Sequence, residues 1–137
     1  MIQSVIQVLI GNAGVQTVIG RNRGNTKYKI FPVYADEKEE PPFTVASITG
    51  NNPNYCKDLP SRMDEVSFRL VTYSKEYYQM DTIDNALRFA IDGYKGTSAD
   101  ITLQGVRLVN QQDLQVEGKD LMARASDYIA QVKRTPA

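Results

Sequence analysis

Few side chains in this 137-residue chain are of a type that carries out chemistry. It has no histidine and a single cysteine, Cys56. The absence of histidine excludes His-based general acid–base catalysis, Ser-His and Cys-His nucleophilic pairs, and the commonest protein metal ligand. A lone thiol forms no intrachain disulfide and no cysteine metal cluster, so Cys56 is expected to be an ordinary small residue. The sequence therefore argues against an enzyme, and it predicts no catalytic, metal-binding or cofactor-binding residue.

Two short charged segments are candidates for binding. The acidic segment 36–40, DEKEE, offers oxygen ligands for a divalent cation, but it lacks the spacing of a recognised site, and a solvated turn is the alternative. The basic segment contains Arg21, Arg23, Lys27 and Lys29, four positive charges in nine residues. Such a loop could attract a phosphate backbone without reading its sequence, and here too a solvated turn is the alternative.

The overall composition is that of one small domain without a strong charge. The chain has 16 basic and 16 acidic residues, which argues against binding nucleic acid through bulk charge and mildly favours self-association. No apolar run approaches the roughly 20 residues needed to span a bilayer, and the N-terminus lacks the basic start of a signal peptide. We expect a soluble cytoplasmic protein with no membrane partner.

The clearest structural pattern lies in residues 64–94. Apolar and polar residues alternate over 64–73, which predicts a strand with one buried face. Ser74 stands where a helix N-cap belongs, and Glu76 follows in the expected first turn. Apolar residues then recur every three or four positions over 75–94, which predicts an amphipathic helix; they are Met80, Ile83, Leu87, Ala90, Ile91 and Tyr94.

The remaining segments complete an α+β domain spanning 1–137. Residues 1–19 form an N-terminal helical segment, and the sheet–helix core covers 28–133 with further strands predicted at 28–35, 43–50, 99–110 and 121–134. Pro32 places the first strand at a sheet edge or breaks it there. The expected fold is an antiparallel or mixed sheet of about five strands, packed by a central amphipathic helix plus an N-terminal helix.

Three surface features are candidates for contacts with partners. Tyr78 and Phe89 project opposite the core stripe of the helix, either toward a neighbouring subunit or under another part of the same chain. The strand 121–134, with Met122 and Arg124, is expected at a sheet edge that a second subunit could extend, unless it is an ordinary protected edge. The segment 51–62 reads as an irregular connection or a partner-binding loop, in which the candidate residues are Pro53, Tyr55 and Leu59.

The order of these segments resembles the tail-completion family of long-tailed bacteriophages, also described as tail terminator or tail-to-head joining proteins. The matching segments follow an N-terminal amphipathic helix and are KIFPVYA, PPFTVASITG, VSFRLVTYSKEYYQMDTIDNALRFAI and VRLVNQQDLQVEGKDLMARASDYIAQV. The likeness covers nearly the whole chain as a pattern of elements. The chain departs from the family in the segment 51–62 and in the basic GRNRGN loop.

The resemblance implies a virion structural protein that performs no chemistry and needs no cofactor. Its protomers would form a ring, typically a hexamer, that caps the tail tube protein and joins it to the head–neck connector protein. Double-stranded DNA would pass through the lumen without sequence recognition, close to the basic loop. The location would be the virion tail, after assembly in the host cytoplasm. The alternative is a monomeric or dimeric α+β module that binds a small ligand or a regulatory partner.

Overall fold

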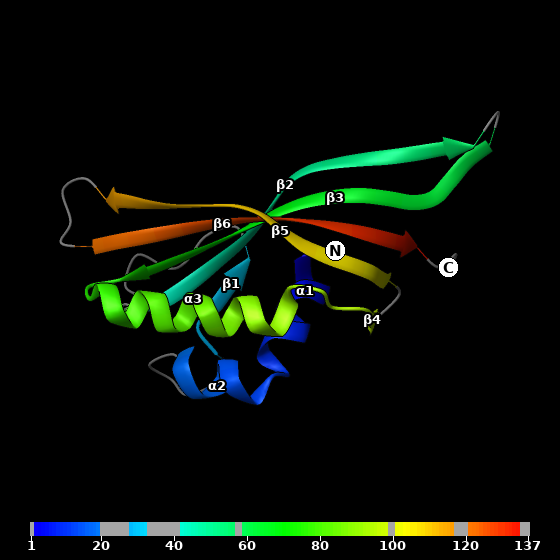
Figure 1. Ribbon diagram of the computed structural model, residues 1–137. Coiled ribbons are helices and arrows are strands. Elements are labelled where there is room, and N and C mark those ends of the chain that lie inside the picture. The colour runs from blue at the N-terminus through cyan, green and yellow to red at the C-terminus, as the bar shows by residue number, and fades with distance from the viewer. Residues whose placement is uncertain are drawn as a thin grey trace.

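The computed structural model describes residues 2–19, 28–32, 42–56, 59–98, 101–116 and 121–134. In these ranges three helices lie on one side of a six-stranded sheet, as Figure 1 shows. In chain order the elements are α1 (Ile2–Ile10), α2 (Ala13–Ile19), β1 (Ile30–Pro32), β2 (Phe43–Cys56), β3 (Leu59–Ser74), α3 (Tyr77–Ile91), β4 (Gly96–Ser98), β5 (Ile101–Val116) and β6 (Leu121–Arg134). None of the described helices is long and apolar enough to cross a membrane.

The sheet has the strand order β1-β2-β3-β6-β5-β4. Each of its four long strands is antiparallel to the next, whereas the short β1 runs parallel to β2. The predicted α+β class with a mixed sheet is therefore confirmed. The strand count is six rather than about five, because the short β4 adds to the outer side of β5. As expected for a strand that contains Pro32, β1 lies at an edge of the sheet.

Residues 51–56 and 59–62 lie in the paired strands β2 and β3, so the prediction of an irregular connection is wrong for these residues. The pairing continues to the last residue of β2 and the first residue of β3, where Cys56 lies opposite Leu59. Pro53 and Pro60 are tolerated because each stands where its strand has a neighbour on one side only in the described sheet: β1 covers only 44–46 of β2, and β6 joins β3 only from Met63 onward. Shifts in the β2–β3 register, next to Gly50 and next to Pro53, absorb the irregular residues.

The strand β6 lies in the interior of the sheet, and its prediction as an edge strand is wrong. It pairs with β3 on one side, from Met63 opposite Lys133 to Ser74 opposite Met122, and with β5 on the other side. The β5–β6 hairpin thus docks onto the sheet through its second strand. Met122 and Arg124 therefore stand in a strand that already has two neighbours, and no second subunit can extend the sheet there.

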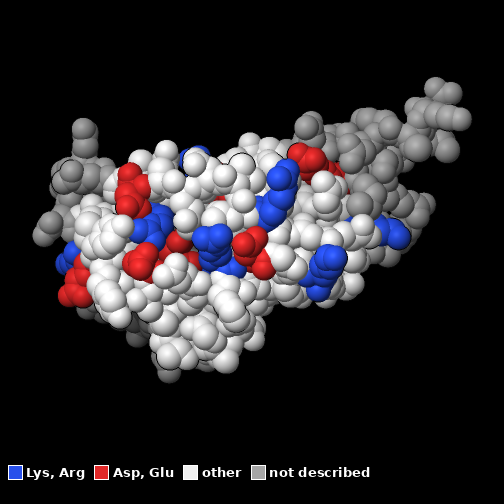
Figure 2. Space-filling view, viewed as in Figure 1, with Lys and Arg blue, Asp and Glu red and all other residues white. Residues whose placement is uncertain are grey.

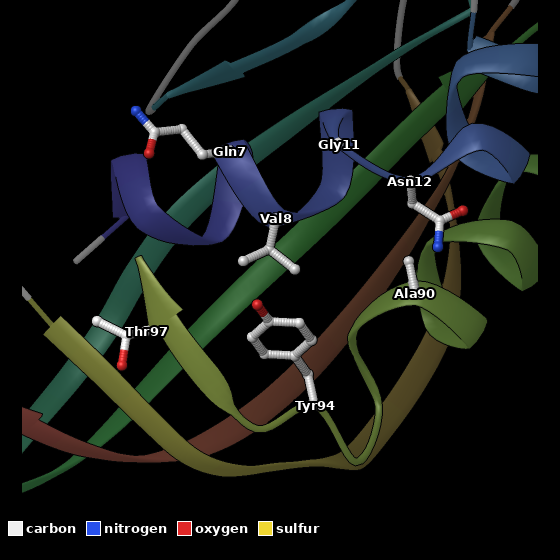
Figure 3. Close-up of a pocket in the computed structure, with 7 residues that line it drawn as sticks. All are labelled: Gln7, Val8, Gly11, Asn12, Ala90, Tyr94 and Thr97. Atoms are coloured by element: carbon white, nitrogen blue, oxygen red, sulfur yellow. The ribbon is translucent and has the colours of Figure 1, made fainter. Parts of the chain in front are cut away.

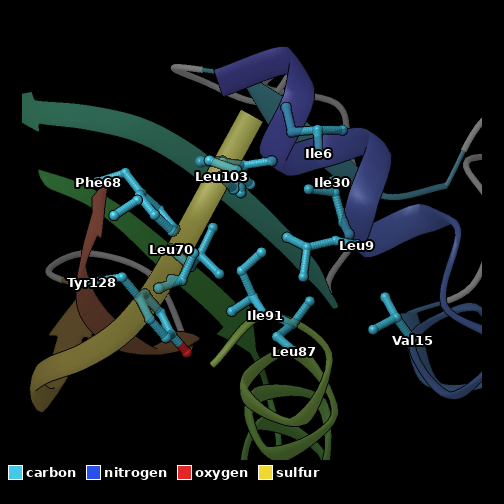
Figure 4. Close-up of a cluster of buried hydrophobic side chains, with 14 of the residues drawn as sticks. Ile6, Leu9, Val15, Ile30, Phe68, Leu70, Leu87, Ile91, Leu103 and Tyr128 are labelled. Atoms are coloured by element: carbon cyan, nitrogen blue, oxygen red, sulfur yellow. The ribbon is translucent and has the colours of Figure 1, made fainter. Parts of the chain in front are cut away.

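Buried apolar side chains of the described residues form a core between the helices and the sheet, as the close-up in Figure 4 shows. The strand β3 contributes Phe68, whose ring stacks on that of Tyr128 from β6 with the centroids 5.3 Å apart. The predicted apolar stripe of α3 faces this core. The sequence predicts a central helix plus an N-terminal helix, whereas in the structure α1 and α2 pack beside α3 and the three helices share the cover of the sheet.

The helix α3 begins three residues after the predicted N-cap. Its N-cap is Glu76, which has extended backbone angles and makes no capping hydrogen bond with its own side chain. Ser74 still supports the helix start, because its hydroxyl accepts a hydrogen bond from the Glu76 N–H at 3.2 Å and donates one to Gln79 at 2.9 Å. The serine therefore ends β3 and orients the chain for the helix that follows.

Candidate functional site

The outward side of α3 carries exposed aromatic side chains. Tyr78 is 82% exposed and Phe89 is 87% exposed, and the neighbouring Tyr77 is 52% exposed. No other part of the described chain covers Tyr78 or Phe89, so the two rings are open to solvent. The alternative in which the N-terminal helices cover them is excluded for the described residues, because α1 and α2 pack on the core beside α3 instead.

The outer long strand β5 runs beside α3 and carries exposed apolar side chains of its own. The Tyr77 hydroxyl donates to the Asp113 carboxylate at 3.2 Å, and at the other end of the helix the Gly93 N–H donates to the Val106 carbonyl at 2.6 Å. Five of the six large apolar side chains that are exposed in the described chain lie on these two elements. These side chains do not share one face, because Asp113 points toward α3 and its neighbour Leu114 therefore points to the opposite face of the sheet.

Arg124 holds the start of α3 to the sheet. Its guanidinium donates to Asp81 at 2.6 Å and to Asp113 at 2.8 Å, and to the Tyr77 hydroxyl at 2.9 Å. Its side chain is only 10% exposed, and it lies 5.4 Å from the centre of the Tyr77 ring. The hydrogen bond from Arg124 keeps the pKa of the Asp113 carboxyl below its ordinary value.

A second carboxylate of α3 is buried beneath this network. Asp84 is 1% exposed, accepts hydrogen bonds from Ser126 at 2.8 Å and from Gln111 at 2.6 Å, and lies 3.7 Å from the Arg124 guanidinium. These partners satisfy the oxygen atoms of the buried carboxylate, so Asp84 has a structural role. The network joins α3 to both β5 and β6, and thereby fixes the helix that presents Tyr78 and Phe89.

The charged side chains on this face are balanced. Figure 2 shows acidic and basic groups interspersed in a band across the face, with no large area of one sign. One ion pair in the described sheet joins Arg69 on β3 to Asp127 on the neighbouring β6, with 2.7 Å between Nε and Oδ1. Such a surface has no strong attraction for a polyanion, which agrees with the neutral composition.

An open groove lies between α1 and the end of α3, as Figure 3 shows. It has a volume of about 450 Å³, and Val8 and Tyr94 approach each other across it. None of its seven lining residues is charged; they are Gln7, Val8, Gly11, Asn12, Ala90, Tyr94 and Thr97. The groove therefore lacks the convergent charged groups that orient a small polar ligand.

The predicted interface residues fall into two environments. Tyr78 and Phe89 are exposed, whereas Arg124 is held by its own chain and Met122 is half-buried in β6. Contact of any of them with another subunit stays a prediction. The backbone of the predicted partner-loop residues lies in the β2–β3 hairpin; they are Pro53, Tyr55 and Leu59.

The predicted charged segments lie mostly outside the described residues. This holds for Arg21, Arg23 and Lys27 and for the acidic segment 36–40, whereas Lys29 is half-buried just before β1. In the described part of the chain no cluster of three or more histidine, cysteine or acidic residues could hold a metal ion.

The network around Arg124 is absent from the sequence predictions. A signal was present, because Asp84 falls beside the apolar stripe of α3, where a charge needs a partner. The partner could not be named, because Arg124 comes 40 residues later and meets Asp84 only through the β3–β6 and β5–β6 pairing.

The sequence is matched by no protein-family model and by no curated protein. Its fold, however, is similar to that of a chain in a solved structure, "Virion of native gene transfer agent (GTA) particle". The TM-score is 0.73 at 13% sequence identity, and the match covers 97% of this chain and 94% of that chain. The two chains therefore share one fold over nearly their whole lengths.

Proposed function

We propose that this protein is a virion structural protein of the tail-completion type. Six copies form a closed ring at the head-proximal end of the tail tube, where the ring contacts the tail tube protein on one face and the head–neck connector protein on the other. Double-stranded DNA passes through the lumen. The whole-length likeness to a chain of a virion particle and the sequence resemblance to tail-completion proteins both support this function.

The observation that carries the proposal is the exposed aromatic pair on a firmly anchored helix. Interface cores are enriched in aromatic residues, and each aromatic ring that becomes buried contributes roughly 1.5–3 kcal/mol. Tyr78 and Phe89 gain little of this in a monomer, since they are 82% and 87% exposed. Because Arg124 already fixes α3 to β5 and β6, little ordering entropy is lost when a neighbouring subunit docks on the helix.

The function that we propose is geometric. The ring terminates the tube by covering its last subunits, and the β2–β3 hairpin, with Pro53, Tyr55 and Leu59, contacts the tube or the neck. Arg21, Arg23, Lys27 and Lys29 face the lumen, where six copies of the loop attract the phosphate backbone through charge alone. No step requires a catalytic group or a cofactor.

The alternative function, a small-ligand or regulatory module, would use the groove between α1 and α3. That groove is uncharged and open, and it does not account for the exposed rings of Tyr78 and Phe89. A ring of identical subunits does account for them, and we therefore prefer it.

The test is deletion of the gene for this protein from the genome that encodes the proposed particle, followed by electron microscopy of the particles that are produced. We expect filled heads separated from tails, and tails of irregular length. A plasmid copy with Lys75→Ser, an exposed position just before α3, should restore normal particles, whereas a copy with Phe89→Ser should not. Joined particles with tails of normal length in the absence of the gene would refute the proposed function.

A further inference from the structure

We propose that neighbouring subunits are joined by strand pairing: the outer edge of β5, residues 109–116, pairs antiparallel with the outer edge of β2, residues 47–53, of a second copy of this chain. This inference rests on the proposed ring and names the contact that closes it. It replaces the edge on β6, which the fold excludes.

Both long outer strands are only partly covered by their short neighbours. On one side of the sheet, β1 pairs with residues 44–46 of β2. On the other side, β4 pairs with residues 101–103 of β5. Beyond these contacts, each long strand continues for many residues without a strand on its outer side in the described sheet.

The end of α3 covers a further part of the β5 edge. The Gly93 N–H donates to the Val106 carbonyl at 2.6 Å, and the Leu108 N–H donates to the Asp92 carboxylate at 3.2 Å. From Val109 onward, no described residue outside the sheet makes a hydrogen bond with a backbone N–H or C=O group of β5. The free segment of β5 is therefore 109–116.

The charges of the sheet are placed opposite to the usual pattern. Sheets of monomeric proteins place charged residues on edge strands, where they prevent pairing with other chains. Here the 14 residues of β2 include no charged residue, although the chain is 23% charged and about three would be expected. The free segment of β5 contains one charge, Asp113, and Arg124 neutralises it.

The interior strands carry the charges instead. β3 and β6 contain eight charged residues, which are Arg62, Asp64, Glu65, Arg69, Arg124, Asp127, Lys133 and Arg134. Charge on interior strands gives no protection against edge pairing. The two free edges are thus electrostatically compatible, and their uncharged side chains can make hydrogen bonds and apolar contacts across a subunit boundary.

The strand directions suit a head-to-tail contact. Each of the four long strands is antiparallel to the next, so β2 and β5 run in opposite directions. When two copies stand side by side in one orientation, β5 of the first copy meets β2 of the second as an antiparallel pair. The free segments lie at opposite ends of the sheet, and a tilt of the strands to the ring axis accommodates this offset, as in closed barrels.

Apolar side chains lie on both free segments. Val109 is 53% exposed and Leu114 is 43% exposed on β5, and Ile48 is 45% exposed on β2. A second copy paired at these edges covers all three side chains. The contact therefore combines backbone hydrogen bonds with burial of apolar surface, the two sources of affinity in strand addition.

The test uses one blocking charge on each edge, in Leu114→Lys and Ile48→Lys. Because the two edges are different surfaces, each variant keeps one good edge. We expect each variant alone to assemble at least tenfold more weakly than the wild type in sedimentation velocity. An equimolar mixture should form a heterodimer of about 31 kDa, two chains of 15.4 kDa, through the intact β5 edge of Ile48→Lys and the intact β2 edge of Leu114→Lys.

The control is Gln104→Lys, which adds the same charge to an exposed position of β5 outside the free segment and should assemble like the wild type. Thermal unfolding of all three variants, each at a concentration low enough to keep it monomeric, checks that they fold. Hydrogen exchange of the amides in 109–116 should slow at least tenfold when the wild-type chain assembles.

Three outcomes would overturn the inference. Rings that persist in both blocking variants would show that the edges are not used, and would leave the proposed function intact. A homodimer formed by Ile48→Lys alone would indicate a two-fold β5–β5 contact. A wild-type chain that stays monomeric in concentrated solution would refute both the strand pairing and the ring.

Discussion

Replacing Phe89 with serine should weaken self-assembly and leave the stability of the fold almost unchanged. Complete burial of a phenylalanine side chain contributes roughly 1.5–3 kcal/mol. Phe89 is 87% exposed, so only about an eighth of that, roughly 0.2–0.4 kcal/mol, is at stake in the free energy of unfolding. Phenylalanine and serine also have similar helix propensities, so α3 should persist.

The same substitution removes a whole aromatic ring from the proposed interface. A loss of roughly 1.5–3 kcal/mol for each contact corresponds to about a tenfold to hundredfold weaker association. The matched control is Leu87→Ala, two residues earlier on the same helix and 0% exposed. That change should lower the free energy of unfolding by about 2–5 kcal/mol, because it leaves a cavity in the core.

Urea denaturation measures the free energy of unfolding, and sedimentation velocity over a range of concentrations measures the association. A loss of unfolding free energy above about 1 kcal/mol in Phe89→Ser would place the ring in the core of the monomer and contradict the exposure in the structure. Unchanged association would remove Phe89 from the interface.

Three further predictions concern the polar network and the core. Arg124→Leu should lower the free energy of unfolding by about 3–5 kcal/mol, because it leaves the buried Asp84 without its cation. The control Arg69→Leu breaks a partly exposed ion pair and should lower it by no more than about 1 kcal/mol. Equal effects of the two substitutions in urea denaturation would refute a structural role of the Arg124 network. Arg124 lowers the pKa of Asp113 in the folded chain, so the stability that this pair contributes should be present above the ordinary carboxyl pKa of about 3.9 and be lost as the pH falls through the lowered value. In Asp113→Asn the urea midpoint should therefore fall less than in the wild type when the pH is lowered. Parallel plots of midpoint against pH for the two proteins would contradict this. Tyr128→Phe should leave the stability of the fold unchanged or raise it by up to about 1 kcal/mol in thermal unfolding, because the Tyr128 hydroxyl is buried without a hydrogen-bond partner among the described residues. A clear loss of stability would mean that the hydroxyl has a partner.

Local patterns of the sequence predict the elements well. The change from alternating residues to helical spacing near Ser74 appears in the structure as the end of β3 and the start of α3. That pattern is set by which face of each element is buried, and burial of one face is common to every fold of this class. For the same reason the buried apolar residues of α3 could be predicted individually, although the buried Asp84 could not.

The order of the strands could not be predicted in the same way. A period of two shows which face of β6 is buried but does not show which strands lie beside it. The interior position of β6 follows from its pairing with β3, a long-range contact for which no local signal exists. The prolines of 51–62 led to the wrong prediction of an irregular connection for a related reason. Proline breaks a strand only where the strand is paired on both sides.

The site shows the same division between local and long-range information. The outward positions of Tyr78 and Phe89 could be predicted from helical spacing, and the structure places both in solvent. The Arg124 network joins α3, β5 and β6, and it required the register of the sheet. The contrast in charge between outer and interior strands is visible in the sequence, but it has meaning only once the strand order is known.

The most direct test of the account is the molecular mass of the assembled protein, combined with electron microscopy of the same sample. Sedimentation equilibrium of the purified chain should give about 92 kDa, six chains of 15.4 kDa, and images should show closed rings with a central opening. A single species of 15.4 kDa at every concentration, with no ring in any image, would contradict the claim that this fold is completed by copies of itself.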